Sequence, residues 1–322
     1  MRNWIIDLQR QISNQLIREV RHRETSDLFQ NIKEHMMKKQ KINLKKEVID
    51  FTFLLPAFLV FLFMILIPLI MGVRYTFTDW DGISAVQNYV GFKNFNTVFH
   101  DKDLLVPIKN TLTFTVITVI CVNVIGLGLA LLVNHEFKGI NIVKSIIFIP
   151  LVISLVLVSQ MWMYVYNDFF SIIGLENPLV NQKLVMLGLC GMCIWKESGL
   201  AMMVYLAGLK GIPTDVTEAA VMDGANAWQR FRNVTIPFLA PAFTYCIPLW
   251  LAGGLRMFDY AAVATNGGPG SASTTMTYYI YKYLFPYNKV GYGQTVAMIY
   301  LAVCIVISTF VTNKLRKREI DL

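Results

Sequence analysis

The chain has 322 residues, of which 55% are hydrophobic and 16% are charged. A water-soluble domain of this composition would expose larger apolar patches than such proteins carry, which excludes an ordinary soluble fold. The 29 Lys and Arg exceed the 21 Asp and Glu, but they flank apolar runs and form no continuous stripe. The charge therefore indicates a protein in the lipid bilayer, with no nucleic-acid partner.

Residues 1–46 form a polar, basic extension that we expect to lie in the cytoplasm. It has no short apolar core followed by small residues, so no removable signal peptide is expected. Its apolar residues recur every four positions among arginines, at Trp4, Leu8, Ile12, Leu16 and Val20. This spacing predicts an amphipathic helix that lies on the anionic inner leaflet or docks on a partner protein. A solvated tail fits the same charges, and the sequence leaves the choice open.

Six apolar runs have about the 20 residues that a helix needs to cross a bilayer. They cover residues 51–73, 111–133, 145–166, 184–207, 238–263 and 293–312. Backbone N–H and C=O groups in hydrocarbon need partners within their own segment, so these runs should be helices. The fold class predicted is an all-α membrane protein, with a domain of six transmembrane helices over residues 47–322.

The basic residues indicate how these helices are oriented. With a cytoplasmic N-terminus, the segments on the inner side hold 20 of the 29 Lys and Arg, and the outer segments hold 7. An excess on one side is what the positive-inside rule expects of the cytoplasmic side. Both termini are therefore predicted to be cytoplasmic, and the last helix is anchored there by Lys314, Arg316, Lys317 and Arg318.

A loop over residues 210–241 joins the fourth and fifth runs on the cytoplasmic side. A short helix is expected over 214–222, and Gly224 permits the turn that ends it. Asn226, followed three residues later by Gln229, is typical of a capping box that opens a second short helix. The loop is therefore predicted to form a protruding pair of short helices.

Glu218 in this loop stands beside Ala219 and Ala220, which present almost no side chain. The first short helix could thus enter a narrow groove on another protein while one carboxylate makes a directed contact. From spacing alone, an ordinary hairpin between two spans is the simpler interpretation.

Four charged residues fall inside the apolar runs, where charge is costly and usually faces protein or a water-filled cavity. Arg256 and Asp259 are three residues apart, so we expect them on one helical face, where they can neutralise each other. Lys196 and Glu197 are adjacent, point in different directions and need separate partners. Pairing is the simplest role of these charges, and substrate contact is the alternative.

Several short motifs occur together in and around the loop. Within it they are Glu218-Ala219-Ala220, Asp223-Gly224-Ala225, Ile236-Pro237 and Pro241. Outside it they include Trp195, Gly199, 206–209, Arg256, 258–259, 265–269, 278–281 and 291–293. Together these motifs resemble the permease subunits of binding-protein-dependent ABC importers, with their EAA loop, and in particular the carbohydrate-importing branch. The resemblance covers roughly residues 50–315.

This resemblance implies a permease that pairs with a second, homologous permease around a central pathway in the bacterial inner membrane. It also implies an ATP-binding subunit dimer beneath them and an extracytoplasmic binding protein above. The residues that would couple the chain to the ATPase are Glu218, Ala219, Ala220, Asp223 and Gly224. The sequence has no Gly-x-x-x-x-Gly-Lys-Ser/Thr loop, so we expect a non-catalytic subunit without a cofactor of its own, with ATP and Mg²⁺ on the partner ATPase.

The resemblance further implies a sugar or oligosaccharide as cargo. From the charges and aromatic residues in the last three helices, we predict that these helices line its pathway. Candidate pathway residues are Trp195, Lys196, Tyr205, Tyr245, Trp250, Arg256 and Asp259. The aromatic rings offer flat faces to sugars, although packing is the commoner role of aromatics in spans. Because Lys196 and Arg256 are cations, an acidic sugar such as a uronate oligosaccharide also remains a candidate cargo. A non-sugar solute such as a polyol or a glycerophosphodiester is the alternative cargo.

Two other classes of membrane protein compete with a transporter subunit. A membrane-embedded enzyme would need a cluster of His, Asp or Glu within the spans, and the four histidines lie in separate loops. A simple channel would need neither the Glu218 loop nor an ATPase. The acidic pairs Asp79/Asp81 and Asp101/Asp103 lack the continuation of a calcium-binding loop, so no metal site is expected. We interpret them as surface acids near the dock of the binding protein.

Overall fold

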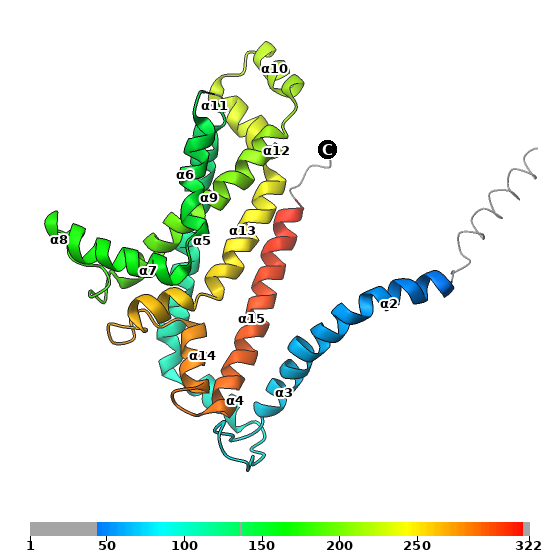
Figure 1. Ribbon diagram of the computed structural model, residues 1–322, viewed down its shortest axis with the longest axis vertical. Helices are drawn as coiled ribbons and strands as arrows, with labels where there is room; N and C mark the ends of the chain where they lie inside the picture. Colours follow the sequence, from blue (N-terminus) through cyan, green and yellow to red (C-terminus); the bar gives the residue numbers. More distant parts are fainter. Residues whose placement is uncertain (1–43, 136, 318–322) are drawn as a thin grey trace, which may run out of the picture. The chain divides into compact units, whose positions relative to one another are not determined.

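The structure is a computed structural model that describes residues 44–135 and 137–317 (Figure 1). The chain divides into two compact units, Met1–Leu69 and Ile70–Leu322. The amphipathic pattern predicted in the N-terminal extension lies outside the described residues. Those residues are mostly helical and contain no β-strand beyond one isolated bridge between Thr78 and Tyr89.

The described part of the first unit is one apolar helical run. It begins with α2 (Leu44–Phe61), continues through the π-helical turn η1 (Leu62–Leu66) and enters α3 (Ile67–Tyr75). Large apolar side chains are exposed along it, such as Phe53 at 83% and Met64 at 75%. Such exposure suits a helix surrounded by lipid or by another protein chain.

Four long helices form the framework of the second unit: α5 (Leu105–Val133), α9 (Val185–Lys210), α13 (Ala240–Leu255) and α15 (Val290–Arg316). α5 packs along α9 and α13, and α13 packs on α15 (Figure 1). Small residues lie at these contacts, since Gly126 of α5 faces Ala201 of α9 and Gly254 of α13 faces Thr115 of α5. Helices in a bilayer associate through close packing, which small residues permit.

α6 (Ile140–Val152) lies on α9, where Gly199 allows the two backbones to approach. A Cβ atom at Gly199 would lie 2.5 Å from the Ile147 carbonyl oxygen, so an added methyl group would push the helices apart. We expect Gly199→Ala to lower the free energy of unfolding by about 1–3 kcal/mol, the usual cost of overpacking. The measurement is thermal unfolding of the purified protein in detergent.

Gly128→Ala is the matched control for Gly199→Ala. Gly128 is also a helical glycine, on α5, but a Cβ atom there would have open space around it. Because alanine favours a helix over glycine, this control should unfold at the wild-type temperature or above it. Equal unfolding temperatures for the two variants would contradict the close approach of α6 and α9.

Several described helices are long and apolar enough to cross a bilayer. Four are single helical runs: Phe51–Tyr75, Lys102–Val133, Val185–Lys210 and Val290–Arg316. Two more spans arise only if each of two bent pairs counts as one: Ile140–Val152 with Leu155–Ile172, and Ala227–Phe238 with Ala240–Leu255. Within the described residues, six spans are therefore the upper count and four the lower.

The third apolar run is not the continuous helix predicted over residues 145–166. α6 ends within it, and a second arm leaves at an angle of 101°. This arm consists of α7 (Leu155–Tyr164), η3 (Val165–Phe169) and α8 (Phe170–Ile172).

Local residues explain this break. Pro150 has no N–H to donate within α6, which weakens the last turn of the helix. Ser154 then starts α7, because its side chain accepts a hydrogen bond from the Leu157 N–H at 3.4 Å. The hydropathy of the run carries no sign of this change of direction.

The fifth apolar run also differs from the helix predicted over residues 238–263. The chain enters it through α11 (Ala227–Arg230), η4 (Phe231–Thr235) and α12 (Ile236–Phe238), which meet α13 at 67°. α13 ends at Leu255, and a turn over residues 256–258 leads toward η5 (Ala261–Thr265). The predicted helix was therefore too long at its C-terminal end.

Short helices gather at one end of the second unit: α4 (Lys93–His100), η2 (Lys102–Leu104) and α14 (Met276–Leu284) (Figure 1). There the Asp101 carboxylate accepts hydrogen bonds from the Tyr279 hydroxyl at 2.8 Å and from the Tyr292 hydroxyl. Partial burial raises the pKa of Asp101, but these bonds and one from the Asp103 N–H outweigh that effect. The pKa of Asp101 therefore lies below its usual value of 3.8.

We expect Asp101 to contribute stability that depends on pH. Because its pKa is lowered by folding, the contribution is present above pH 3.8 and is lost as the pH falls through the lower, folded value. Asp101→Asn should therefore lower the unfolding temperature at about pH 7 and change it little at about pH 2. Thermal unfolding at both pH values checks this, and a variant as stable as the wild type at neutral pH would contradict it.

The acids at Asp79 and Asp81 stabilise a loop in the same region. Hydrogen bonds from the Ser84 hydroxyl and from the N–H groups of Ser84 and Ile83 lower the pKa of Asp81 to about 2. Asp79 accepts a hydrogen bond from the Asn88 N–H at 3.0 Å. Both acids thus hold the loop in shape, and their contact with a binding protein stays a prediction.

Candidate functional site

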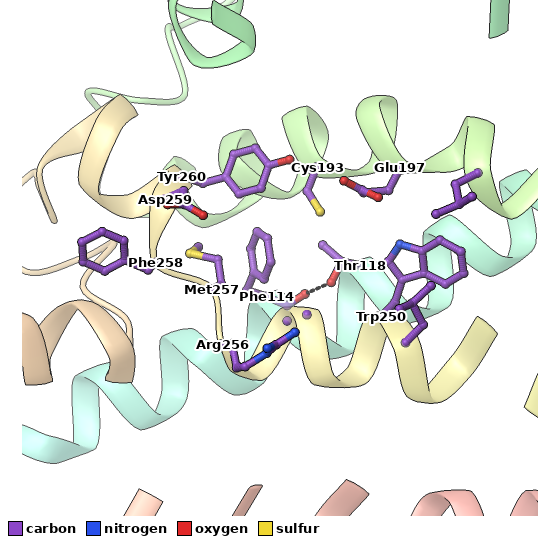
Figure 2. Close-up of a pocket in the computed structure, with 14 residues that line it drawn as sticks. Phe114, Thr118, Cys193, Glu197, Trp250, Arg256, Met257, Phe258, Asp259 and Tyr260 are labelled. Atoms are coloured by element: carbon purple, nitrogen blue, oxygen red, sulfur yellow. Dashed lines mark hydrogen bonds between the residues drawn. The ribbon is translucent and has the colours of Figure 1, made fainter. Parts of the chain in front are cut away.

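A cavity of about 470 Å³, here named the central pocket, lies among α5, α9, α13 and the segment after α13 (Figure 2). Its labelled lining residues come from distant parts of the chain: Phe114, Thr118, Cys193, Glu197, Trp250, Arg256, Met257, Phe258, Asp259 and Tyr260. A polar-lined space among membrane-spanning helices is the kind of place where a transporter can hold a solute.

The central pocket holds ionisable groups of both signs, at Glu197, Arg256 and Asp259. Arg256 is turned back along α13, where its Nε donates to the Ala252 carbonyl oxygen at 3.2 Å. The prediction that Arg256 and Asp259 share a helical face and neutralise each other is wrong. α13 ends at Leu255, and in the described structure no ion pair joins the three groups. The Glu197 carboxylate accepts a hydrogen bond from the Trp250 side chain. Its remaining acceptor capacity, together with Arg256 and Asp259, can serve a ligand that carries hydroxyl groups.

Aromatic and apolar side chains complete the lining. Trp250 and Tyr260 are 5% and 6% exposed, and Phe258 adjoins Asp259 in sequence. The Tyr260 hydroxyl lies beside the Cys193 thiol and has no nitrogen or oxygen partner among the described residues. Buried hydroxyls normally have such a partner, so this one can accept or donate a bond to a bound molecule. Flat apolar faces beside planar polar groups suit sugar rings.

The structure brings three of the seven candidate pathway residues into the central pocket, namely Trp250, Arg256 and Asp259. Trp195 and Tyr245 lie outside it. Trp195 packs edge-on against Trp162, with ring centroids 5.8 Å apart, and Tyr245 is exposed on α13.

Lys196 and Tyr205 also lie outside the central pocket, and both have internal partners. Lys196 points toward α6, where its ammonium donates to the Leu151 carbonyl oxygen at 2.6 Å. Tyr205 is fully buried, and its hydroxyl donates to the side chain of Asn123 on α5. In this structure both side chains contribute to helix packing, and their assignment to the pathway lining stays a prediction.

The list of candidate pathway residues leaves out several residues of the central pocket. Glu197 had a signal, because it is a charge inside an apolar run, but its adjacency to Lys196 does not tell which of the two faces a cavity. Tyr260 had a weaker signal, because it directly follows the candidate residue Asp259 in the sequence. Phe114 and Thr118 had no signal, because they come from a distant helix and resemble packing residues.

A second candidate site lies at the opposite end of the second unit from α4 and α14 (Figure 1). α10 (Thr214–Met222) forms where a short helix was predicted, and Gly224 ends it with a left-handed φ of 78°. Asn226 and Gln229 form the predicted capping box, with hydrogen bonds of 2.9 and 2.8 Å. These local structures are confirmed, whereas their role in coupling stays a prediction.

Glu218 on α10 is exposed and makes no hydrogen bond or ion pair through its side chain with another described residue. Three apolar residues are exposed near it, with Val221 at 49%, Met222 at 86% and Trp228 at 66%. We name Glu218–Met222 together with Trp228 the docking surface. Exposed apolar side chains around a carboxylate are typical of a contact with another protein.

Comparison with known proteins places the chain in a family. Residues 122–319 match the family described as "Binding-protein-dependent transport system inner membrane component". The chain is 33% identical over 294 residues to the probable starch degradation products transport system permease protein AmyD of Thermoanaerobacterium thermosulfurigenes. That alignment covers 89% of this chain and 100% of the relative.

Two solved structures are also similar to this chain. One is the crystal structure of a bacterial ABC transporter involved in the import of the acidic polysaccharide alginate. Its matching chain is 26% identical with a TM-score of 0.74, and the match covers 85% of this chain and 97% of that one.

The other solved structure is the bacterial alginate ABC transporter in complex with alginate pentasaccharide-bound periplasmic protein. Its matching chain is 25% identical with a TM-score of 0.73, and the match covers 86% of this chain and 96% of that one. The fold and the family resemblance predicted from the motifs are thereby confirmed. The chain belongs to the binding-protein-dependent transport system inner membrane components and is a permease of the sugar-type ABC importers.

Proposed function

We propose that this permease carries a sugar or oligosaccharide, delivered by an extracytoplasmic binding protein, through an importer driven by ATP. The observation that carries the proposal is the central pocket, where Trp250 and Tyr260 lie with Glu197, Arg256 and Asp259 among the spanning helices. Sugar rings need both apolar faces and planar hydrogen-bonding groups, and this lining offers both.

The charges of the central pocket favour a neutral sugar over an acidic one. The pocket has one cation, Arg256, against the two carboxylates of Glu197 and Asp259. Lys196, the second cation that suggested an acidic cargo, is bonded to carbonyl oxygens of α6. A uronate would meet like charge at low dielectric, which costs free energy. Products of starch degradation, the cargo in the name of the relative AmyD, are neutral and fit this balance.

The docking surface is proposed as the contact with a partner ATPase. Glu218, Ala219 and Ala220 would enter a groove on that partner, and Asp223 with Gly224 would hold the turn behind them. ATP and Mg²⁺ would bind the ATP-binding subunit dimer, and this chain would be non-catalytic. Because a nucleotide shifts conformations only through contacts that differ between them, the coupling would be mechanical.

We also propose the assembly and its orientation. A second, homologous permease would complete the pathway beside the central pocket. The positive-inside rule places the docking surface and both termini on the cytoplasmic side of the bacterial inner membrane. The region of α4 and α14 would then face the binding protein.

The test is the ATPase activity of the complex purified with its own binding protein, over a panel of solutes. The panel holds neutral malto-oligosaccharides, uronate oligosaccharides, a polyol and a glycerophosphodiester. Stimulation by neutral sugars is the expected result. Stimulation by a uronate would overturn the charge argument, and stimulation by the polyol or the glycerophosphodiester alone would overturn the sugar assignment.

A further inference from the structure

Lys196 is a buried cation that does not line the central pocket. Its side chain is 8% exposed, and its ammonium donates to the carbonyl oxygens of Leu151 at 2.6 Å and Pro150 at 3.5 Å. Both carbonyls belong to the last turn of α6, where C=O groups lack partners within the helix. A cation at this end also interacts favourably with the helix dipole. Lys196 therefore caps α6 from the neighbouring helix α9.

The cap lies at the elbow, which we define as residues 152–155 between α6 and α7. The two arms diverge there by 101°. One turn further along α9, Gly199 brings the α9 backbone against Ile147 of α6. α9 thus holds the first arm at two points, through a close backbone contact and through the ammonium of Lys196.

Both arms of the elbow are connected to the lining of the central pocket. The first arm, α6, packs on α9, where Glu197 directly follows Lys196 and lines the pocket (Figure 2). On the other side, α7 packs on η5, and Trp162 of α7 packs on the buried cluster that contains Cys193 and Tyr260. A change at the elbow would therefore move the two walls of the pocket relative to each other, namely the part of α9 that carries Glu197 and the segment after α13 that carries Tyr260.

We infer that Lys196 is a positioning residue that fixes the elbow and thereby the separation of the two walls of the central pocket. Without the ammonium, two carbonyl oxygens would lack a partner in apolar surroundings, and the end of α6 would shift to find one. The pocket would then hold its cargo less well. The docking surface would keep its own residues, so ATP hydrolysis would continue while less sugar is moved for each ATP.

The inference rests on the proposed function, and the experiment is the ratio of sugar transported to ATP hydrolysed by the reconstituted complex. Lys196→Met should lower this ratio by about fivefold, within the range that coupling residues give. Lys196→Arg keeps a cation that can donate to the same carbonyls and should keep the wild-type ratio. Lys183→Met removes an exposed lysine just before α9 and is the matched control. Loss of assembled complex alone would lower both rates together and leave the ratio unchanged, and that result would overturn the inference.

A second readout needs no cargo. Hydrogen–deuterium exchange of the backbone amides around residues 151–158 reports local opening of the elbow in the full complex. Exchange there should be faster in Lys196→Met than in the wild type and unchanged in Lys183→Met. Equal exchange in all three proteins would overturn the inference. A wild-type complex that transports no sugar would instead refute the proposed function, while the exchange experiment would still test the elbow.

Discussion

Glu218→Lys should abolish the stimulation of ATP hydrolysis by the binding protein while leaving the permease inserted and assembled. The Glu218 carboxylate is exposed on α10 without a hydrogen-bond or ion-pair partner among the described residues, so its replacement disturbs no such contact there. Loss of a buried charge contact at an interface costs roughly 2–5 kcal/mol. Stimulation should therefore fall by at least about tenfold. The measurement is the ATPase rate of the purified complex with and without liganded binding protein.

Two further variants sharpen the test of the docking surface. Gly224→Pro should have the same effect, because Gly224 has a φ of 78° and proline requires a φ near −65°. Asp168→Lys reverses the charge of an exposed residue outside the loop and should leave the stimulation of ATP hydrolysis intact. Full stimulation in Glu218→Lys or in Gly224→Pro would refute the coupling role of α10.

Glu197→Gln and Asp259→Asn should each reduce sugar transport by about tenfold or more. Both carboxylates line the central pocket, and a hydrogen bond to a charged group contributes roughly 1.5–3 kcal/mol. The amide replacements keep the shape of the side chains, so the fold should be retained. The measurement is uptake of a labelled malto-oligosaccharide into proteoliposomes at equal amounts of assembled complex.

Glu176→Gln is the matched control for the central pocket, because it makes the same chemical change at an exposed loop residue. Its uptake should equal that of the wild type. If Glu197→Gln and Asp259→Asn also transported at the wild-type rate, the central pocket would not be the place where this permease holds its cargo.

The long helices could be predicted from the sequence, but their breaks could not. Hydropathy depends only on composition along a run, and residues 145–166 are apolar on both sides of the break. Pro150 and Ser154 were the available signals, and neither is decisive, since proline occurs in continuous transmembrane helices. The angle of 101° also involves tertiary contacts, since α6 packs on α9 and α7 packs on η5, which are distant in the sequence.

The candidate site was predictable only in part, for a similar reason. A charge inside an apolar run marks Lys196 and Glu197 as unusual, but only the packing shows that one caps α6 and the other lines the central pocket. Aromatic residues such as Tyr205 and Trp250 look alike in the sequence. Their different surroundings are decided by which helix packs against each of them. The loop around Gly224 was better predicted, because turns and caps depend on neighbouring residues.

The most direct measurement is the accumulation of labelled maltotriose in proteoliposomes that contain this permease with its partner permease, ATPase and binding protein. We predict uptake that requires both ATP and the binding protein and that exceeds uptake of a uronate trisaccharide. Flux of maltotriose that is independent of ATP would indicate a channel. Preferential uptake of the uronate would contradict the assignment of a neutral sugar to the central pocket.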